Sequence, residues 1–494
     1  MNLALNYFVK ETSLQSFLRE SAVEVPEFED APRVPLEDSE PWNEYLEKLE
    51  LNKKDLNLLD DEEYCKKVHE YRQNNPIQFD SRGLPTKDYR TVFSEFPRSD
   101  FVGNVLSNYT TLVNKRHILG ANKEKIPYEP ISPAATIFFH IRPTWHYKHQ
   151  MGVHFLCEGQ RYNHIHGNLW LSFKDITANK IREYSQYYKG REDCFDPWKV
   201  VPYTLDITDY EQCQHFKTLL LDDQYEYDVK WMLKKGRYAH NGVGVVPVDQ
   251  EKAKEIINEV QCPYGNYYLA QRYIKNPMLI HNRKFDFRTY LVIANMDPLI
   301  VLYHDGFIRM SMNEYDLNSN DKSTHLTNLK VAQKTMDTHN LTKSEQEMLL
   351  KDQSWSYTHL HNYLMNLGLV GEDWLDNYLR KKLKENMFHI VRMNLDKLMK
   401  HPQVFELFGL DFLLDTDLNL WYIEANLTPS ISGTSDEKRE LNTKLITDLI
   451  DLEYALMYNG DFDEILKGTN YEVIFDGRKK GLDRYSGVIE KRCL

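Results

Sequence analysis

The chain has 494 residues, of which 41% are hydrophobic and 27% are charged, and its net charge is −13. This composition is typical of a soluble globular protein with two or three domains, and no apolar run reaches the roughly 20 residues that a membrane-spanning helix requires. Residues 1–10 lack the charged start and apolar stretch of a signal peptide, and six cysteines are few for this length. We therefore expect no membrane association, no disulfide framework, reduced thiols and a cytoplasmic location.

The negative charge is concentrated near the N-terminus. Residues 1–63 hold 17 acidic and 6 basic side chains, and Val25–Trp42 contains four prolines. Because prolines block helices and central strands while like charges repel, we expect an extended arm over 1–63. The rest of the chain is nearly neutral, which argues against nucleic-acid binding. Residues 64–135 show no clear strand periodicity and predict a helical and looping linker or accessory region.

Mixed helices and strands are predicted from Thr136 onward. Thr136–Ile141 is a short apolar run typical of a buried strand. Arg288–Ala294 and Leu299–His304 predict neighbouring strands joined by a turn at Asn295–Pro298. The later elements predicted are a capping box that opens a helix at Thr342–Glu345, an amphipathic helix over 375–399, and strands at Phe408–Leu414 and Leu420–Ala425.

Two of these strands carry carboxylates in apolar surroundings. Asp411 lies in one strand, and Glu424 and Asn426 share a face of the next because side chains alternate along a strand. A buried carboxylate without a partner is costly or shifts its pKa. Three oxygen-bearing side chains that converge from paired strands could instead hold Mg²⁺, which prefers oxygen ligands and nucleotide phosphates. Two buried acids hydrogen-bonded to loop amides are the alternative, and these residues alone leave both open.

A charged face is predicted along Arg283–Tyr290. Lys284, Asp286 and Arg288 alternate with two phenylalanines, which places the charges on one side of a strand. A solvated sheet edge is the ordinary explanation of such a pattern. Nucleotide recognition would use the same order of charges, with cations for phosphate oxygens and a carboxylate for hydroxyls.

Phosphate binding is one interpretation of the segment before this strand. Lys234 stands at the end of the apolar strand Trp231–Lys235, and a loop with Gly242 and Gly244 follows. Glycines allow backbone amides to approach phosphates closely, although many hairpins carry the same pattern. The strand Tyr268–Ile274 is either an adenine-binding hinge or an ordinary core strand.

Further motifs complete an ordered set along the chain: Asn163–Gly167, Lys174–Asp175, Tyr273–Ile280, Arg283–Tyr290, His325–Asn328, Phe405–Asp411 and Glu424–Ser430. In this order they resemble the tubulin–tyrosine-ligase-like family of ATP-grasp ligases. The resemblance covers about residues 136–460 and does not extend to residues 1–130. It implies an α+β ATP-grasp fold with N-terminal, central and C-terminal subdomains, the nucleotide between two antiparallel sheets, and a C-terminal tail over 461–494.

The resemblance also implies a role for each matching residue. Arg288 and Arg309 are expected to be catalytic and to face the γ-phosphate and the reacting carboxylate. Asp411, Glu424 and Asn426 are expected to bind Mg²⁺. The expected ATP-binding residues are Lys234, Gly242, Gly244, Gln271, Arg272, Tyr273, Ile274, Lys284 and Asp286, and the expected substrate-side residues are His325, Thr327 and Asn328. The chain departs from the family at Lys235 and Val243, where a proline and a basic residue are common. These two departures bear on its affinity for the nucleotide.

The function implied is an ATP-dependent ligation of an amino acid to glutamate side chains, or to an existing side chain, of tubulin or another acidic protein through an acyl phosphate. Trp355–Leu364 looks most like the glycine-adding elongase branch, so glycine is the first candidate and glutamate the second. The location implied is the cytoskeleton, including the cilium axoneme.

Two further hypotheses stay open. An inactive scaffold in a microtubule or other large assembly is disfavoured by the intact metal ligands. A small-molecule ATP-grasp ligase is disfavoured by the His325–Asn328 motif. Arg380–Lys384 is either an acceptor-binding basic patch or, as is more common, a solvated helix face.

Overall fold

The computed structural model describes residues 61–94, 96, 98–115, 132–140, 156–221, 230–235, 245–249, 251–252, 254–255, 262–263, 268–319, 321–327, 331–332, 336, 342, 354–458 and 460–493. Most of the expected N-terminal arm, residues 1–60, therefore lies outside the described residues. The same is true of Gly242, Gly244, Asn328 and residues 343–345 of the capping box.

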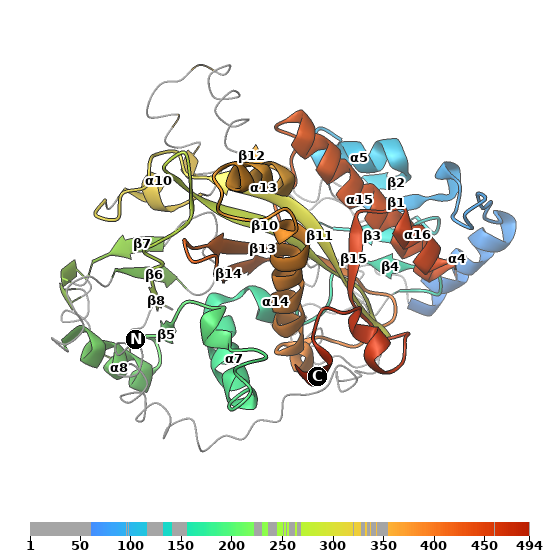
Figure 1. Ribbon diagram of the computed structural model, residues 1–494. Helices are drawn as coiled ribbons and strands as arrows, with labels where there is room; N and C mark the ends of the chain where they lie inside the picture. Colours follow the sequence, from blue (N-terminus) through green and yellow to red (C-terminus); the bar gives the residue numbers. More distant parts are fainter. Residues whose placement is uncertain are drawn as a thin grey trace.

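A seven-stranded antiparallel sheet forms the centre of the molecule (Figure 1). Its two longest strands meet in a turn at residues 297–298, and Met296 pairs with Leu299. The predicted neighbouring strands are therefore confirmed. The strands of this sheet are β9 (Leu279–Ile280), β10 (Arg283–Met296), β11 (Leu299–Met310), β12 (Ser354–Trp355), β13 (Glu406–Leu414), β14 (Leu420–Asn426) and β15 (Tyr471–Asp476). β12, β11, β10, β13 and β14 lie side by side in that order, while β15 pairs with β11 and β9 with β10.

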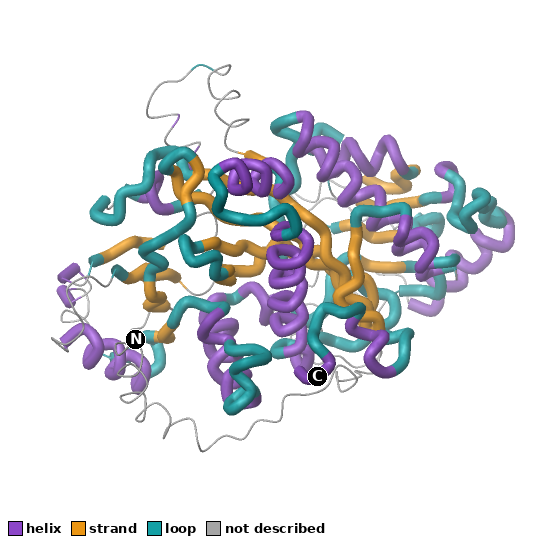
Figure 2. The backbone as a smooth tube through the Cα atoms, in the orientation of Figure 1, coloured by secondary structure: helices purple, strands orange, loops and turns teal. Residues whose placement is uncertain are grey.

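Alternate residues of β10 enter two different hydrophobic cores. Leu291 and Ile293 pack with the helices on one face, whereas Tyr290 and Val292 pack with α15 (Asp436–Met457) on the other. The first face is covered by α13 (Tyr357–Asn366), a π-helical turn η6 (Leu375–Arg380) and α14 (Lys381–Arg392). The predicted amphipathic helix is thus confirmed over 375–392. Figure 2 shows the strands in orange running through the centre, with purple helices around them.

A smaller antiparallel sheet with the order β5-β8-β6-β7 carries the predicted strand lysine and hinge strand. A small core of its own joins this sheet to α8 through Phe216, Trp231 and Leu233. The elements are β5 (Thr204–Asp206), α8 (Tyr210–Leu221), β6 (Trp231–Lys235), β7 (Val245–Val248) and β8 (Tyr268–Arg272).

Residues 64–135 contribute to a four-stranded parallel sheet, which differs from the helical and looping linker expected there. The strand order is β2-β1-β3-β4, so strands from this region pair with the predicted strand near Thr136. Strands of two to five residues are too short to show a period of two, which explains the difference. The elements are α4 (Asp61–Asn74), β1 (Thr91–Ser94), α5 (Phe101–Tyr109), β2 (Thr111–Lys115), β3 (Ile137–Phe139) and β4 (Arg161–Tyr162).

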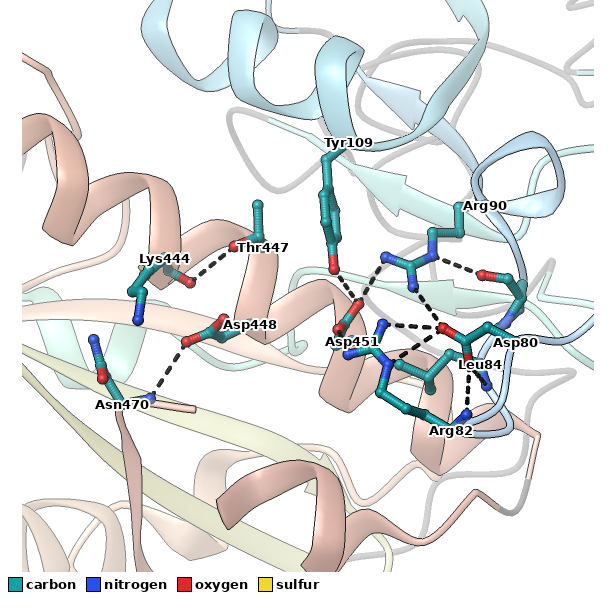
Figure 3. A network of polar contacts seen from close by, with 11 residues as sticks. Asp80, Arg82, Leu84, Arg90, Tyr109, Lys444, Thr447, Asp448, Asp451 and Asn470 are labelled. Atoms are coloured by element: carbon teal, nitrogen blue, oxygen red, sulfur yellow. Dashed lines mark hydrogen bonds and ion pairs between the residues drawn. The ribbon is translucent and has the colours of Figure 1, made fainter. Parts of the chain in front are cut away.

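A polar cluster around the buried Asp451 fastens this N-terminal region to α15, and we call it the clasp (Asp80, Arg82, Arg90, Tyr109 and Asp451; Figure 3). The two carboxylate oxygens of Asp451 accept from Arg82 and Arg90 at 2.8 Å each. Tyr109 donates to the same carboxylate at 2.6 Å. Segments about 350 residues apart in sequence are thereby joined by charge-assisted hydrogen bonds.

The C-terminal residues are part of the main sheet rather than a detached tail. β15 pairs with β11 over residues 471–476, and α16 (Phe462–Lys467) precedes it. The domain boundaries at residues 63, 135 and 460 stay predictions. The remaining described elements are η2 (Lys87–Tyr89), α6 (Leu169–Ser172), α7 (Lys174–Tyr187), η5 (Pro197–Lys199), α10 (Lys322–His325), η7 (Leu395–Lys397), η8 (Gly481–Tyr485) and η9 (Lys491–Cys493).

All six cysteines form disulfides, so the prediction of reduced thiols without a disulfide framework is wrong. The pairs are Cys65–Cys157, Cys194–Cys493 and Cys213–Cys262. The partners lie 92, 299 and 49 residues apart, and only the fold brings them together. Among the described residues, no helix combines the length and hydrophobicity that crossing a bilayer requires.

Candidate active site

A cleft of about 920 Å³ lies where the small sheet faces β10, β11, β13 and β14. The small sheet contributes Lys234 and Gln271, and Arg272–Ile274 extend the same wall. The opposite wall is polar because the alternation along β10 aims its charged face at the cleft and its phenylalanines into the core. That wall includes Lys284, Asp286, Arg309, Asp411, Glu424 and Asn426.

The pairing of β13 with β14 brings together the three predicted metal ligands. Asp411 lies opposite Glu424, and Gly409 lies opposite Asn426. Asn426 Nδ2 is 3.4 Å from Asp411 Oδ2. Two carboxylates and the side-chain amide of Asn426 therefore converge at one edge of the cleft. This donor set fits Mg²⁺, which commonly takes one or two carboxylates and completes its shell with phosphates and water.

Lysines surround Glu424 and keep it ionised. Lys174, the first residue of α7, lies 3.1 Å from its carboxylate. Burial alone would raise the pKa of Glu424, but Lys174 and Lys234 lower that pKa to about 2. Lys174 is absent from the set of site residues predicted above. Its motif was recognised, but a contact across 250 residues carries no local signal.

Two arginines hold the remaining carboxylates in place. Arg288 binds Asp411 through Nε at 2.6 Å and Nη2 at 3.1 Å. Arg309 binds Asp286 at 2.6 and 2.7 Å and also lies 2.8 Å from Asp411. Burial would lower the pKa of Arg309, but Asp286 and Asp411 raise it well above its ordinary value. Both guanidinium groups are therefore charged and oriented in advance.

Two buried lysines of the cleft have few anions near them. Lys234 donates to Gln271 Oε1 at 2.5 Å, and burial lowers the pKa of Lys234 to about 8. Lys284 donates to the Tyr273 hydroxyl at 3.1 Å, and burial lowers the pKa of Lys284 to about 7. A bound polyphosphate would stabilise both ammonium groups, because an opposite charge nearby favours the charged form.

The predicted substrate-side residues lie at the same cleft. The Tyr273 hydroxyl is 2.8 Å from His325 Nδ1, and Thr327 donates to Asp286. Burial lowers the pKa of His325 to about 4, so this imidazole is neutral. Asn328, the third residue of that set, lies outside the described residues.

The profile of the tubulin-tyrosine ligase family matches residues 154–461, well over half of the chain. The chain belongs to the tubulin-tyrosine ligase family. The resemblance seen in the sequence motifs is thereby confirmed.

The names of relatives in this family indicate different activities. Human "Inactive polyglycylase TTLL10" is 34% identical over 190 residues, which cover 37% of this chain and 27% of the relative. "Tubulin glycylase 3B" of Drosophila melanogaster is 30% identical over 222 residues, 44% of this chain and 28% of the relative. Mouse "Probable tubulin polyglutamylase TTLL9" is 36% identical over 200 residues, 38% of this chain and 40% of the relative. The matches therefore span less than half of each relative's length.

The fold is that of an ATP-grasp protein. The C-terminal domain of Kluyveromyces lactis Pby1, described as an ATP-grasp enzyme, superposes with a TM-score of 0.50 and 16% identity. The superposition covers 79% of this chain and 99% of that domain. The predicted α+β ATP-grasp fold of this family member is confirmed, while the roles of its individual site residues stay predictions.

The basic segment of this family member is largely paired. Arg380 binds Asp305 and Asp376. Lys382 and Lys384 lie 2.7 and 2.8 Å from Glu385 and Glu472. These contacts favour the solvated helix face over an acceptor-binding patch.

Proposed function

We propose that this chain is an ATP- and Mg²⁺-dependent ligase that joins an amino acid to a carboxylate of an acidic protein. The observation that carries the proposal is the cleft itself, in which cations and oxygen ligands from two antiparallel sheets converge. Five basic side chains face three acidic ones there, so an anionic substrate would complete the charge balance. The five are Lys174, Lys234, Arg272, Lys284 and Arg309, and the three are Asp286, Asp411 and Glu424.

The position of each residue in the cleft determines its proposed role. Lys234 and Lys284 bind the polyphosphate and the ribose side of ATP. Asp286 accepts hydrogen bonds from the ribose hydroxyls. Asp411, Glu424 and Asn426 would hold Mg²⁺, which when bound neutralises charge on the phosphates. Lys174 keeps Glu424 ionised and oriented for that task.

Two successive reactions then make the product. A carboxylate oxygen of the acceptor attacks the γ-phosphorus, the bond to ADP breaks, and an acyl phosphate forms. The amino group of the incoming amino acid attacks the acyl carbon and loses a proton, and inorganic phosphate leaves with the former carboxylate oxygen. Arg288 and Arg309 stabilise the charge on the acyl group because Asp411 and Asp286 fix them in advance.

Glycine on tubulin is the first candidate among the substrates. The likeness of Trp355–Leu364 to the glycine-adding branch supports it, as does the relative named as a tubulin glycylase. Glutamate is the alternative, supported by the relative named as a polyglutamylase. An inactive scaffold is the third candidate, because one relative is named inactive, although this chain keeps the converging carboxylates. The place of action that fits these acceptors is the cytoskeleton, including the cilium.

The test is a ligation assay with tubulin, ATP, Mg²⁺ and either labelled glycine or labelled glutamate. The matched variant is Glu424→Gln, which keeps the shape of the side chain and removes its charge. We expect the wild-type chain to transfer one label and the variant to transfer neither. Transfer that survives in Glu424→Gln would overturn the site, and wild-type protein that transfers neither label would favour the scaffold.

A further inference from the structure

A buried lysine without an acidic partner lies next to the active site. Lys438 is in the first turn of α15, and only 8% of it is exposed. Its Nζ lies 3.8 Å from the centre of the Phe307 ring. Among the described residues, no carboxylate forms an ion pair with it. The ring face attracts the ammonium group, but this attraction is weaker than a full ion pair.

Three features of this position oppose a positive charge. The first turn of a helix carries the positive end of the helix dipole. The side chain is withdrawn from water, and Arg309 and Arg288 are its charged neighbours. Burial, followed by Arg309 and Arg288, lowers the pKa of Lys438 to about 7. A side chain that costs stability in this way is more often retained for function than for folding.

The register of the central sheet places Lys438 at the reacting end of the cleft. Phe307, which lies under the ammonium group, pairs with Arg288. Arg309 follows two residues later and faces the same side of the sheet. Arg288 and Arg309 already have Asp411 and Asp286 as partners. Of the three cations, Lys438 is therefore the one that has no anionic partner among the described residues.

Lys438 neighbours the two arginines but lies outside the lining of the nucleotide cleft. Lys174, Lys234 and Lys284 all line that cleft. The next residue, Arg439, lines an open groove of about 1170 Å³ between α5 and α15. Lys438 itself lines neither this groove nor the nucleotide cleft, and it lies on the helix that separates the groove from the arginines' strands.

We propose that Lys438 binds the side-chain carboxylate of the protein acceptor and positions it beside Arg288 and Arg309. This inference rests on the proposed ligase function and names the residue that recognises one of its substrates. The ammonium group supplies a charge-assisted hydrogen bond, while the two arginines face the opposite side of the carboxylate. Without an acceptor, the charge on Lys438 only destabilises the folded protein.

The first test is kinetic and uses Lys438→Met, which keeps the length of the side chain, and Lys438→Arg, which keeps its charge. The KM for the protein acceptor should rise about 10- to 100-fold in the methionine variant, while the KM for ATP stays within about twofold. The arginine variant should recover most of the loss. Because the variant removes an unpaired buried charge, its melting temperature should equal or exceed that of the wild type. A fall in melting temperature with equal losses for all substrates would overturn the proposal, as would a rise confined to the KM of the amino acid.

The second test does not depend on turnover. A fluorescent glutamate-rich peptide is titrated with the full chain by anisotropy, beside a peptide in which glutamine replaces each glutamate. The wild type should bind the glutamate peptide more tightly, and Lys438→Met should lose most of that difference. Lys467→Met is the matched control, because Lys467 is an exposed lysine paired with Glu464 at 2.7 Å.

The two tests separate the possible failures. If the wild type transfers no amino acid but binds the glutamate peptide through Lys438, the ligase function fails and the recognition site stands. If ligation proceeds and both peptides bind Lys438→Met as they bind the wild type, the role of Lys438 fails and the ligase function stands.

Discussion

Two clusters of ion pairs, the clasp and the cleft, differ in charge balance. In the clasp, Asp80 and Asp451 face Arg82 and Arg90, so the charges match in number. In the cleft, five basic side chains face three acidic ones and line a cavity. The cleft contains short, bidentate arginine–carboxylate pairs, whereas Arg82 and Arg90 of the clasp each donate one hydrogen bond of 2.8 Å to Asp451. Burial and pairing therefore do not identify a functional site, whereas unbalanced charge around a cavity does.

The largest effect is expected from Glu424→Gln in the cleft. The variant removes a metal-binding charge and leaves Lys174 without its partner at 3.1 Å. Ligation should fall by about 100- to 1000-fold, as it does when a group that stabilises the transition state is lost. Single-turnover label transfer measures the loss. Glu472→Gln, which removes the exposed partner of Lys384, is the control and should retain full activity.

Asp451→Asn in the clasp should lower the stability of the fold and leave the activity nearly unchanged. Arg90 would keep its charge in a buried position without a full partner, so the free energy of unfolding should fall by about 3 kcal/mol. Activity per folded molecule should change less than about twofold, since no clasp residue lines the nucleotide cleft. Urea unfolding and active-site titration measure the two quantities. Asp80→Asn should cost less, because 28% of the Asp80 side chain is exposed. A clasp variant that keeps its stability and loses its turnover would contradict the distinction between the two clusters.

Next to the small sheet, a disulfide rather than a cluster of ion pairs joins two segments of the chain. Cys213 of α8 is joined to Cys262, across 49 residues of sequence. In the chain-entropy description, such a cross-link stabilises the fold by about 2–4 kcal/mol. Reduction, or Cys213→Ser, should therefore loosen the wall that carries Lys234 and weaken ATP binding more than acceptor binding. Thermal unfolding and nucleotide titration with and without dithiothreitol measure this effect, and mass spectrometry under non-reducing conditions checks the three pairs.

The reductant experiment also bears on location. Disulfides persist in oxidising compartments and are rare in the cytosol. A chain that keeps full activity with all six cysteines reduced would agree with the cytoplasmic location expected from the sequence. A chain that loses ATP binding at a cytosolic redox potential would exclude that location for the active form.

Local patterns in the sequence predicted the central strands and their charged face. Asp411 and Glu424 each stand in a strongly apolar segment, which predicts two strands, and β13 and β14 pair at these residues. The alternating charges of β10 lie on the cleft side, as the period of two requires. The family motifs then supplied the roles that the pattern alone left open.

Local sequence patterns do not predict contacts between distant segments of the chain. The ion pair from Lys174 to Glu424 spans 250 residues, and the disulfides span up to 299. The strands of the parallel sheet have at most five residues, too few to show periodicity. Lys438 looks like an ordinary surface lysine among the charges of Asp436–Glu440, and only its burial over Phe307 distinguishes it.

The smallest predicted effect is a pH dependence that arises from the unbalanced charge of the cleft. Burial lowers the pKa of Lys284 to about 7, and a bound polyphosphate would raise it again. ATP then binds most tightly below pH 7, where Lys284 is already protonated. Affinity is lost as the pH rises through the interval between the free and bound pKa values, and Lys284 contributes at most about tenfold per pH unit. Lys234, whose pKa burial lowers to about 8, adds a slope of its own that is retained in Lys284→Met.

Calorimetric titration with ATP and Mg²⁺ between pH of about 7.5 and about 9 measures this slope, since the charge of the nucleotide itself changes little there. Lys284→Met should bind weakly at every pH and show a flatter slope. The clasp offers the control, because Asp451→Asn changes no group in the cleft and should leave the slope of the folded protein unchanged. A wild-type slope equal to that of Lys284→Met would mean that the charge balance of the cleft is set by another group.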